Sequence, residues 1–258
     1  MLRLMHSLKG YTLAARDEAF GSVKDFLFDE EQWTIRYMVA DTGNWLPGRK
    51  VLISPVSLEK PDWDSSTFRV DLSKDDIECA PALETDAPVS RQYEMDWNDI
   101  VGYPYYWGGA MPWGVGTTPR DLMKADRVRG ARDHKPCPED QDRVLRSVEE
   151  VRKYRVEANN GEVGHVEDFI LDDETLAIRY LVIDTRNWLP GRKVLLAPGW
   201  TNGIDWDLHQ LTTTLSREAI KNSPEFNPAE AVNRDYENIL YDYYGRPAYW
   251  EMARADEQ

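Results

Sequence analysis

A tryptophan and an arginine that recur together are the residues best placed by type and spacing to do chemistry in this sequence. Segment 41–52 reads DTGNWLPGRKVL, and segment 184–195 repeats it with a single difference. An exposed aromatic ring beside a guanidinium is typical of residues that anchor protein interfaces. The alternative is structural: the aspartate that opens each segment orients the arginine or accepts hydrogen bonds from turn amides. The four candidate interface residues are Trp45, Arg49, Trp188 and Arg192.

The sequence signals for a metal site are weaker than the repeated Trp/Arg segment. His165, Glu167 and Asp168 lie close in sequence, but the first copy has no histidine at the matching position. No cysteine or second histidine has the spacing of a metal ligand. The acidic turns 29–31 and 172–174 lack the interleaved oxygen ligands and the glycine of a calcium loop. We therefore expect no metal site.

Motifs for catalysis are weaker still. The four histidines do not recur between the copies, which leaves no Ser/His/Asp or Cys/His set. Gly114–Pro119 follows no predicted strand and lacks the Gly-Lys-Ser/Thr of a phosphate loop. Cys79 and Cys137 form no CxxC motif, so we expect free thiols. We expect no catalytic residues, no enzyme activity and no cofactor.

An internal repeat positions these candidates. Residues 143 apart match without an insertion, from Tyr11 and Tyr154 to the Tyr-Trp pairs 106–107 and 249–250. A period of this length indicates a duplicated domain rather than a solenoid. We predict a first domain over residues 1–107, a linker rich in glycine, proline and charge over 108–145, and a second domain over 146–258.

Each copy reads as a series of short strands. Alternating polarity at 21–28 and 164–171 indicates half-buried strands, and the nearly apolar segments 34–41 and 177–184 indicate central strands. The Pro-Gly pair of the repeated segment suits a type II turn, because glycine accepts a positive φ. Five or six short strands in about 75 residues favour a small closed barrel, because closure removes exposed edges. We expect a mainly β protein with two small barrels.

Short helices and an aromatic extension follow the strands of each copy. Ser73 and Ser216 are predicted N-caps of helices that end at a proline. The aromatic extension either enlarges a core that is small for its surface or lines a contact between copies or subunits. The candidate residues of the two extensions are Tyr106, Trp107, Tyr249 and Trp250.

Charge argues against nucleic acid as a partner. The net charge is −15, and residues 1–107 and 146–258 each carry −8, from 11 basic against 19 acidic and 13 basic against 21 acidic residues. Both bodies would be repelled by phosphate backbones and anionic lipid.

No apolar run approaches the roughly 18 residues of a transmembrane segment, and the first ten residues lack the apolar core of a signal peptide. We expect a cytoplasmic protein without a transmembrane segment.

The order of these motifs resembles the PRC-barrel family. The carrying residues are Gly-x-Val-x-Asp-Phe, Ile-Arg-Tyr-x-Val-x-Asp-Thr, Gly-Arg-Lys-Val-Leu-x-x-Pro and a serine-initiated helix that ends at proline, over residues 8–107 and 150–250. The family includes the cytoplasmic domain of the photosynthetic reaction-centre H subunit and the C-terminal domain of a ribosome maturation factor. The resemblance implies two small β-barrels used to bind, assemble or modulate a partner, with no shared catalytic residues.

Two classes of function follow. The first is a non-catalytic binding or assembly module that acts through protein–protein contacts, with an unidentified protein partner or a second copy of the chain. The alternative is a sensor or carrier that binds a small aromatic or quinone-like molecule between barrel and extension. A flat Trp/Arg patch would favour the first class, and an apolar pocket ringed by Tyr and Trp would favour the second.

Overall fold

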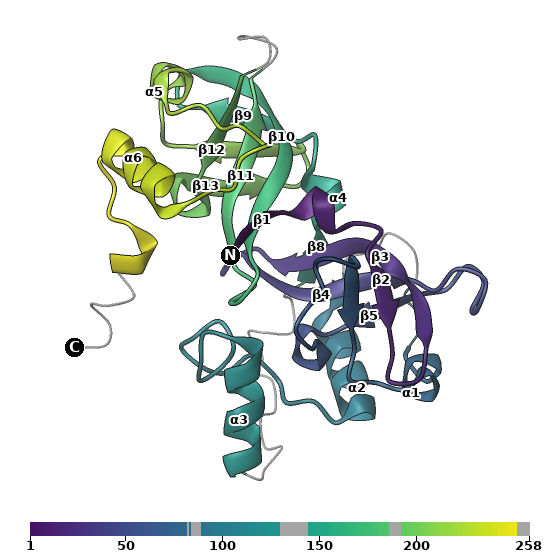
Figure 1. The fold of residues 1–258 in the computed structure, drawn as a ribbon. Helices are drawn as coiled ribbons and strands as arrows, with labels where there is room; N and C mark the ends of the chain where they lie inside the picture. The colour runs from purple at the N-terminus through teal and green to yellow at the C-terminus, as the bar shows by residue number, and fades with distance from the viewer. Residues whose placement is uncertain (82, 84–88, 130–143, 186–191, 252–258) are drawn as a thin grey trace. The chain divides into compact units, whose positions relative to one another are not determined.

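The computed structural model describes residues 1–81, 83, 89–129, 144–185 and 192–251 (Figure 1). The chain divides into two compact units. The first unit comprises His6–Glu150 and Glu174–Ala177, and the second comprises Met1–Met5, Val151–Asp173 and Ile178–Gln258. Each unit is built on a seven-stranded sheet, so the protein is mainly β. Within the described ranges, every helix is too short or too polar to cross a bilayer.

The first unit has the strand order β5-β4-β3-β2-β6, with β8 also paired to β3 and β7 paired to β8. Its strands are β2 (Thr12–Ala14), β3 (Ala19–Asp29), β4 (Thr34–Asp41), β5 (Lys50–Ile53), β6 (Thr67–Arg69), β7 (Val89–Ser90) and β8 (Val144–Ser147). The helical segments around them are η1 (Met5–Leu8), η2 (Pro55–Ser57), α1 (Lys74–Glu78), α2 (Arg91–Val101), α3 (Pro119–Arg129) and α4 (Val148–Val151).

The second unit has the equivalent order β12-β11-β10-β9-β14-β13, with β1 also paired to β10. Its strands are β1 (Leu2–Leu4), β9 (Arg155–Ala158), β10 (Gly161–Asp172), β11 (Ile178–Asp184), β12 (Lys193–Leu196), β13 (Thr201–Asp205) and β14 (Gln210–Thr213). Its helical segments are η4 (Pro198–Trp200), α5 (Arg217–Asn222) and α6 (Arg234–Tyr244).

The predicted turn and caps are confirmed where the structure describes them. Gly48 has a φ of 75°, and the Arg49 amide donates to the Leu46 carbonyl at 3.0 Å, which closes the Pro-Gly turn. The Ser73 hydroxyl accepts from the Asp76 amide, and the Ser216 hydroxyl accepts from the Ala219 amide, both at 3.1 Å. The second Pro-Gly turn lies outside the described residues.

A repeated glycine allows the long strand of each sheet to approach its neighbour. A Cβ on Gly21 would lie 2.2 Å from the Asp41 carbonyl oxygen, and a Cβ on Gly164 would lie 2.0 Å from that of Asp184. No real side chain tolerates such a contact, so these positions require glycine. The two glycines that open the predicted alternating strands therefore set the spacing between β3 and β4 and between β10 and β11.

The first strands of the two repeats are exchanged between the sheets. β1, from the first repeat, pairs with β10 of the second repeat, with Leu4 opposite Ile170. β8, from the second repeat, pairs with β3 of the first, with Ser147 opposite Leu27. Because both partners differ by 143 residues, the two registers are equivalent. The exchange accounts for Met1–Met5 belonging to the second unit and for β8 belonging to the first.

The second sheet must be strongly curled. β12 and β13 are its two end strands, yet only residues 197–200 connect them. Six strands laid flat would separate these edges by about 24 Å, whereas the connection spans about 18 Å at most. The described hydrogen bonds do not join the two edges, so full closure into a barrel stays a prediction.

The exchange makes a specific prediction about truncation. Deleting residues 1–4 removes β1 and leaves the end of β10 unpaired, so backbone amide exchange should rise at residues 170–172. In hydrogen-exchange mass spectrometry, residues 27 and 28 of β3, the equivalents of 170 and 171, serve as the internal control, because β8 still pairs with them. A rise in β3 with no change in β10 would contradict the exchange.

Candidate functional site

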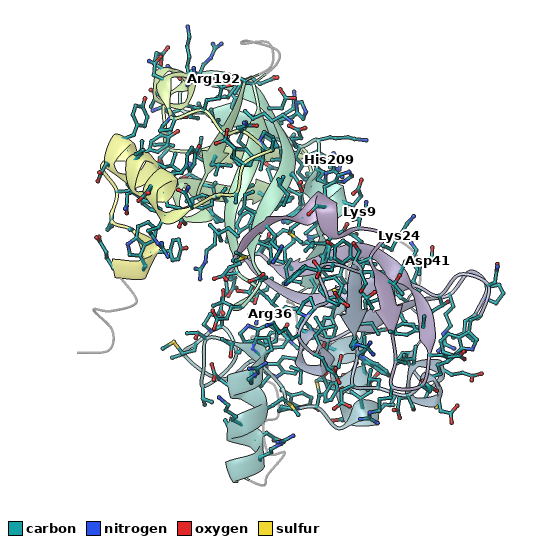
Figure 2. The ribbon with its side chains drawn as sticks, viewed as in Figure 1. Lys9, Lys24, Arg36, Asp41, Arg192 and His209 are labelled. Atoms are coloured by element: carbon teal, nitrogen blue, oxygen red, sulfur yellow. The ribbon has the colours of Figure 1, made fainter. Side chains whose placement is uncertain are left out.

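The arginine of the repeated turn is bound inside its own unit. The Arg49 guanidinium donates to the carbonyl of Ala80, just after α1, and Arg192 donates in the same way to Ser223, just after α5. Arg192 is labelled in Figure 2. The acceptors are also 143 residues apart. A guanidinium here satisfies a carbonyl at the end of a helix, which would otherwise lack a donor. Arg49 and Arg192 are therefore structural in their described contacts.

The tryptophan of the turn is half-buried. The Trp45 ring packs edge-on against Phe20 at 6.3 Å, and the Lys74 ammonium lies 4.4 Å from its centroid. The Asp41 carboxylate accepts from the Gly43 amide at 2.9 Å, so it satisfies a turn amide. The described ring contacts of Trp45 are thus with Phe20 and Lys74, and the described hydrogen bond of the Arg49 side chain is with Ala80, so a flat Trp/Arg patch stays a prediction. Trp188 lies outside the described residues.

A second set of repeated residues forms a more elaborate group in the first unit. On α2, the Arg91 guanidinium donates to the Glu94 carboxylate at 2.9 Å, and the Tyr106 hydroxyl donates to the other carboxylate oxygen at 2.7 Å. All three side chains are buried. Burial raises the pKa of Glu94 to about 7, against the opposing effects of Arg91 and Tyr106. The buried carboxyl, guanidinium and phenol groups are thus bonded to one another.

The same group recurs in the second unit. Arg234 lies 3.1 Å from the Glu237 carboxylate, and the Tyr249 hydroxyl donates to that carboxylate at 3.1 Å. The Tyr180 hydroxyl of β11 also donates to it, at 2.8 Å. Two of the predicted aromatic residues, Tyr106 and Tyr249, thus fasten the extension to the preceding helix.

Arginines stack on the aromatic extension in both units. In the first, Arg36 of β4 lies 4.0 Å from the Tyr106 centroid and Arg91 lies 4.1 Å from that of Trp107. The equivalent distances in the second unit are 4.1 Å and 3.8 Å. We call these groups the first cluster (Arg36, Arg91, Glu94, Tyr106 and Trp107) and the second cluster (Arg179, Arg234, Glu237, Tyr249 and Trp250).

The two clusters differ in exposure. The Arg36 and Arg91 side chains are 1% and 3% exposed, whereas Arg179 and Arg234 are 22% and 51% exposed. Tyr106 and Trp107 are buried, while Tyr249 and Trp250 are half-buried. Equivalent residues therefore make a closed core in one unit and a partly open surface in the other.

Residues of the predicted linker close the first cluster. Trp113 is buried, packs edge-on against Tyr106 at 5.9 Å, and donates its indole N–H to the Thr175 carbonyl at 3.0 Å. Leu122 of α3 joins the same hydrophobic group. Part of segment 108–145 is thus packed structure in the first unit. Matching positions in the second repeat, Ala255 and Asp256, lie outside the described residues.

Sequence reasoning missed the charged members of both clusters. The repeated Ile-Arg-Tyr and Arg-x-Tyr-Glu segments carry Arg36, Arg91, Glu94 and their equivalents at the same offset as the Trp/Arg turn. The signal was present, because a charged residue kept at equivalent positions of two diverged copies needs a reason. Its meaning depended on burial, which the sequence does not state.

The candidate metal residues make other contacts. Glu167 binds Lys193 at 2.7 Å, and the Asp168 carboxylate accepts from the Phe169 amide at 2.8 Å. In the acidic turns, Asp29 pairs with Arg36 at 3.1 Å and Asp172 with Arg179 at 3.0 Å. Across the described ranges, His, Cys, Asp and Glu nowhere gather in threes that could hold a metal ion.

Arginine at the repeated turn should matter for stability. Replacing Arg49 with Ala removes the donor to the Ala80 carbonyl and should lower the free energy of unfolding by about 1–3 kcal/mol. Arg192→Ala should have a similar effect, and Lys60→Ala, at an exposed position, is the control. Chemical denaturation with light scattering checks this. If either variant keeps its stability but changes its oligomeric state, the result would contradict a structural role and favour an interface role for these arginines.

Buried Glu94 should make stability depend on pH. Its pKa is about 7 in the folded protein, above the ordinary value of 4.5, so the folded state holds the proton more tightly. The stabilising contribution is therefore fully present below about pH 4.5 and is lost as the pH rises through about 7. Glu94→Gln should flatten the stability profile between about pH 5 and pH 7. Glu78→Gln, at an exposed position, controls for charge, and an unchanged slope in Glu94→Gln would contradict the prediction.

No protein-family model matches the chain, and no curated protein matches it as a relative. The relation to the PRC-barrel family therefore stays a prediction from the repeated motifs.

Proposed function

We propose that this protein is a non-catalytic binding and assembly module, built from two small barrels of the PRC type, that acts through protein–protein contacts. The curl required of the second sheet supports the barrel, because its end strands are joined by four residues. Residues of the motifs that resemble the PRC-barrel family have structural roles: Gly21 allows close approach to β4, and Arg49 binds the carbonyl that follows α1.

The observation that carries the proposal is the exposure of the second cluster. Arg234 is half exposed while it stacks on Trp250, and Tyr249 beside it is half-buried. Arginine, tryptophan and tyrosine are the residues most enriched among those that dominate binding energy in protein interfaces. A rigid helix and a buried carboxylate hold them in place before a partner arrives, which lowers the entropic cost of binding.

The repeated polar residues also favour a binding role over catalysis. Arg49 holds a carbonyl, and Glu94 is held by Arg91 and Tyr106. A general acid or base must reach a substrate atom, whereas Glu94 is 1% exposed and has both carboxylate oxygens bound. These groups stabilise the fold. The partly exposed Arg234, Tyr249 and Trp250 are the groups that a partner protein could contact.

The small-molecule alternative has weaker support. The rings of Trp200, Tyr241 and Tyr244 contact one another, with centroids 5.1 Å apart for Trp200 and Tyr241 and 4.7 Å apart for Trp200 and Tyr244. Rings at these separations pack as a core. They stabilise α6 against the sheet, and this packing supports a protein-binding surface more than a pocket for a flat ligand.

A comparison of two baits tests the proposal. The full chain and its Arg234→Glu variant are used to capture proteins from an extract of the native organism, with Asp242→Ala on the same helix as the control. We expect at least one protein, or a second copy of the chain, to be captured by the wild type and the control and lost with Arg234→Glu. Arg234 also pairs with buried Glu237, so the captured proteins are compared only if a thermal melt shows that the variant stays folded.

Two results would overturn the proposal. One is identical sets of captured proteins, and identical masses in light scattering, for the wild type and Arg234→Glu. The other is an aromatic small molecule released in equal molar amount when the purified protein is denatured, which would favour a carrier.

A further inference from the structure

The first cluster already contains an occupant, supplied by the same chain. Residues 111–116 form a tight turn, with bridges from Met111 to Gly114 and from Trp113 to Gly116. This turn lays Pro112 and Trp113 on the cluster. The Arg36 guanidinium donates to the Pro112 carbonyl and contacts two rings, 4.0 Å from the Tyr106 centroid and 5.0 Å from that of Trp113. Arg36 is labelled in Figure 2.

The framework under this occupant is the same in both units. The distance from the strand arginine to its carboxylate is 3.1 Å in the first unit and 3.0 Å in the second. Its distance to the tyrosine ring is 4.0 Å and 4.1 Å. The cover differs, as the exposures of 3% for Arg91 and 51% for Arg234 show. The first cluster therefore shows what kind of group the second is shaped to receive.

The contacts of that occupant define its chemistry. It offers a carbonyl oxygen to a guanidinium, whose five donors allow several bonds at once, and a flat aromatic ring that continues the stack of cation and ring. The charges of the second cluster balance, with Arg179 and Arg234 facing Asp172 and Glu237. A neutral segment suits this surface better than an anion.

We propose that the second cluster binds a neutral peptide segment of a partner protein in which proline is followed by tryptophan, as Pro112 and Trp113 are in this chain. The inference rests on the proposed function and names the partner's chemistry. Trp250 and Tyr249 would receive the indole, and the arginines would receive the proline carbonyl. Proline suits the role because its fixed φ reduces the entropy lost on binding.

The probe is a synthetic peptide of residues 108–117, GGAMPWGVGT, labelled with a dye and titrated with the full chain in fluorescence anisotropy. We expect saturable binding of one peptide per chain, because the covalent copy already fills the first cluster. Trp113→Ala in the peptide should weaken binding about tenfold or more, and this change cannot unfold the protein.

Protein variants locate the site. Arg234→Gln, at a half-exposed position, and Trp250→Ala should each weaken binding about tenfold or more, whereas Asp242→Ala should not. Thermal melts show which variants stay folded, and Arg234→Gln carries the conclusion if Trp250→Ala does not. Binding that ignores both substitutions would overturn the proposal.

Two further results would also overturn it. One is the absence of binding at millimolar peptide. The other is binding that appears only after residues 252–258 are deleted, which would make the chain's own end the occupant. If the peptide fails while Arg234→Glu still loses captured proteins, the partner chemistry is wrong and the proposed function stands.

Discussion

The structure of each unit depends on burying a carboxylate. A buried carboxyl group needs polar partners, and Glu94 obtains them from the arginine one helical turn earlier and from a tyrosine twelve residues later. This requirement turns the chain back after α2, because the phenol must reach the helix. The aromatic extension is thereby held against the sheet, where Arg36 can stack on it. The second unit meets the same requirement with Arg234, Glu237 and Tyr249.

Duplication lets one framework serve two purposes. In the first unit, a proline and a tryptophan from the segment between the repeats cover the arginines, and the result is a hydrophobic core. In the second unit, the same side chains keep their mutual contacts but remain partly exposed. Because the buried carboxylate holds these side chains in place, they stay ordered even where they are partly exposed. Because β1 and β8 are exchanged, each sheet contains one strand of the other repeat.

Much of the fold could be predicted from residues whose local chemistry is decisive. Gly48 needs a positive φ, Ser73 and Ser216 cap helices, and alternating polarity marks β3 and β10, so turns, caps and strands followed from the sequence. The exchange could not be predicted, because pairing between distant strands leaves no local signal. The Trp/Arg turn was the most conspicuous repeat, yet the Arg49 guanidinium donates to a carbonyl at the end of a helix rather than facing a partner. The repeated Arg-x-Tyr-Glu was less conspicuous, and its importance rests on burial that only the fold creates.

The most direct test of this account compares equivalent rings of the two units in one sample. Hydroxyl-radical footprinting of the intact chain, read by mass spectrometry, reports the solvent access of each tryptophan and tyrosine. We expect Trp250 and Tyr249 to oxidise several times faster than Trp107 and Tyr106, although the four rings hold equivalent positions in the repeat. Equal rates, or faster oxidation of Trp107, would contradict the division into a closed and an open cluster.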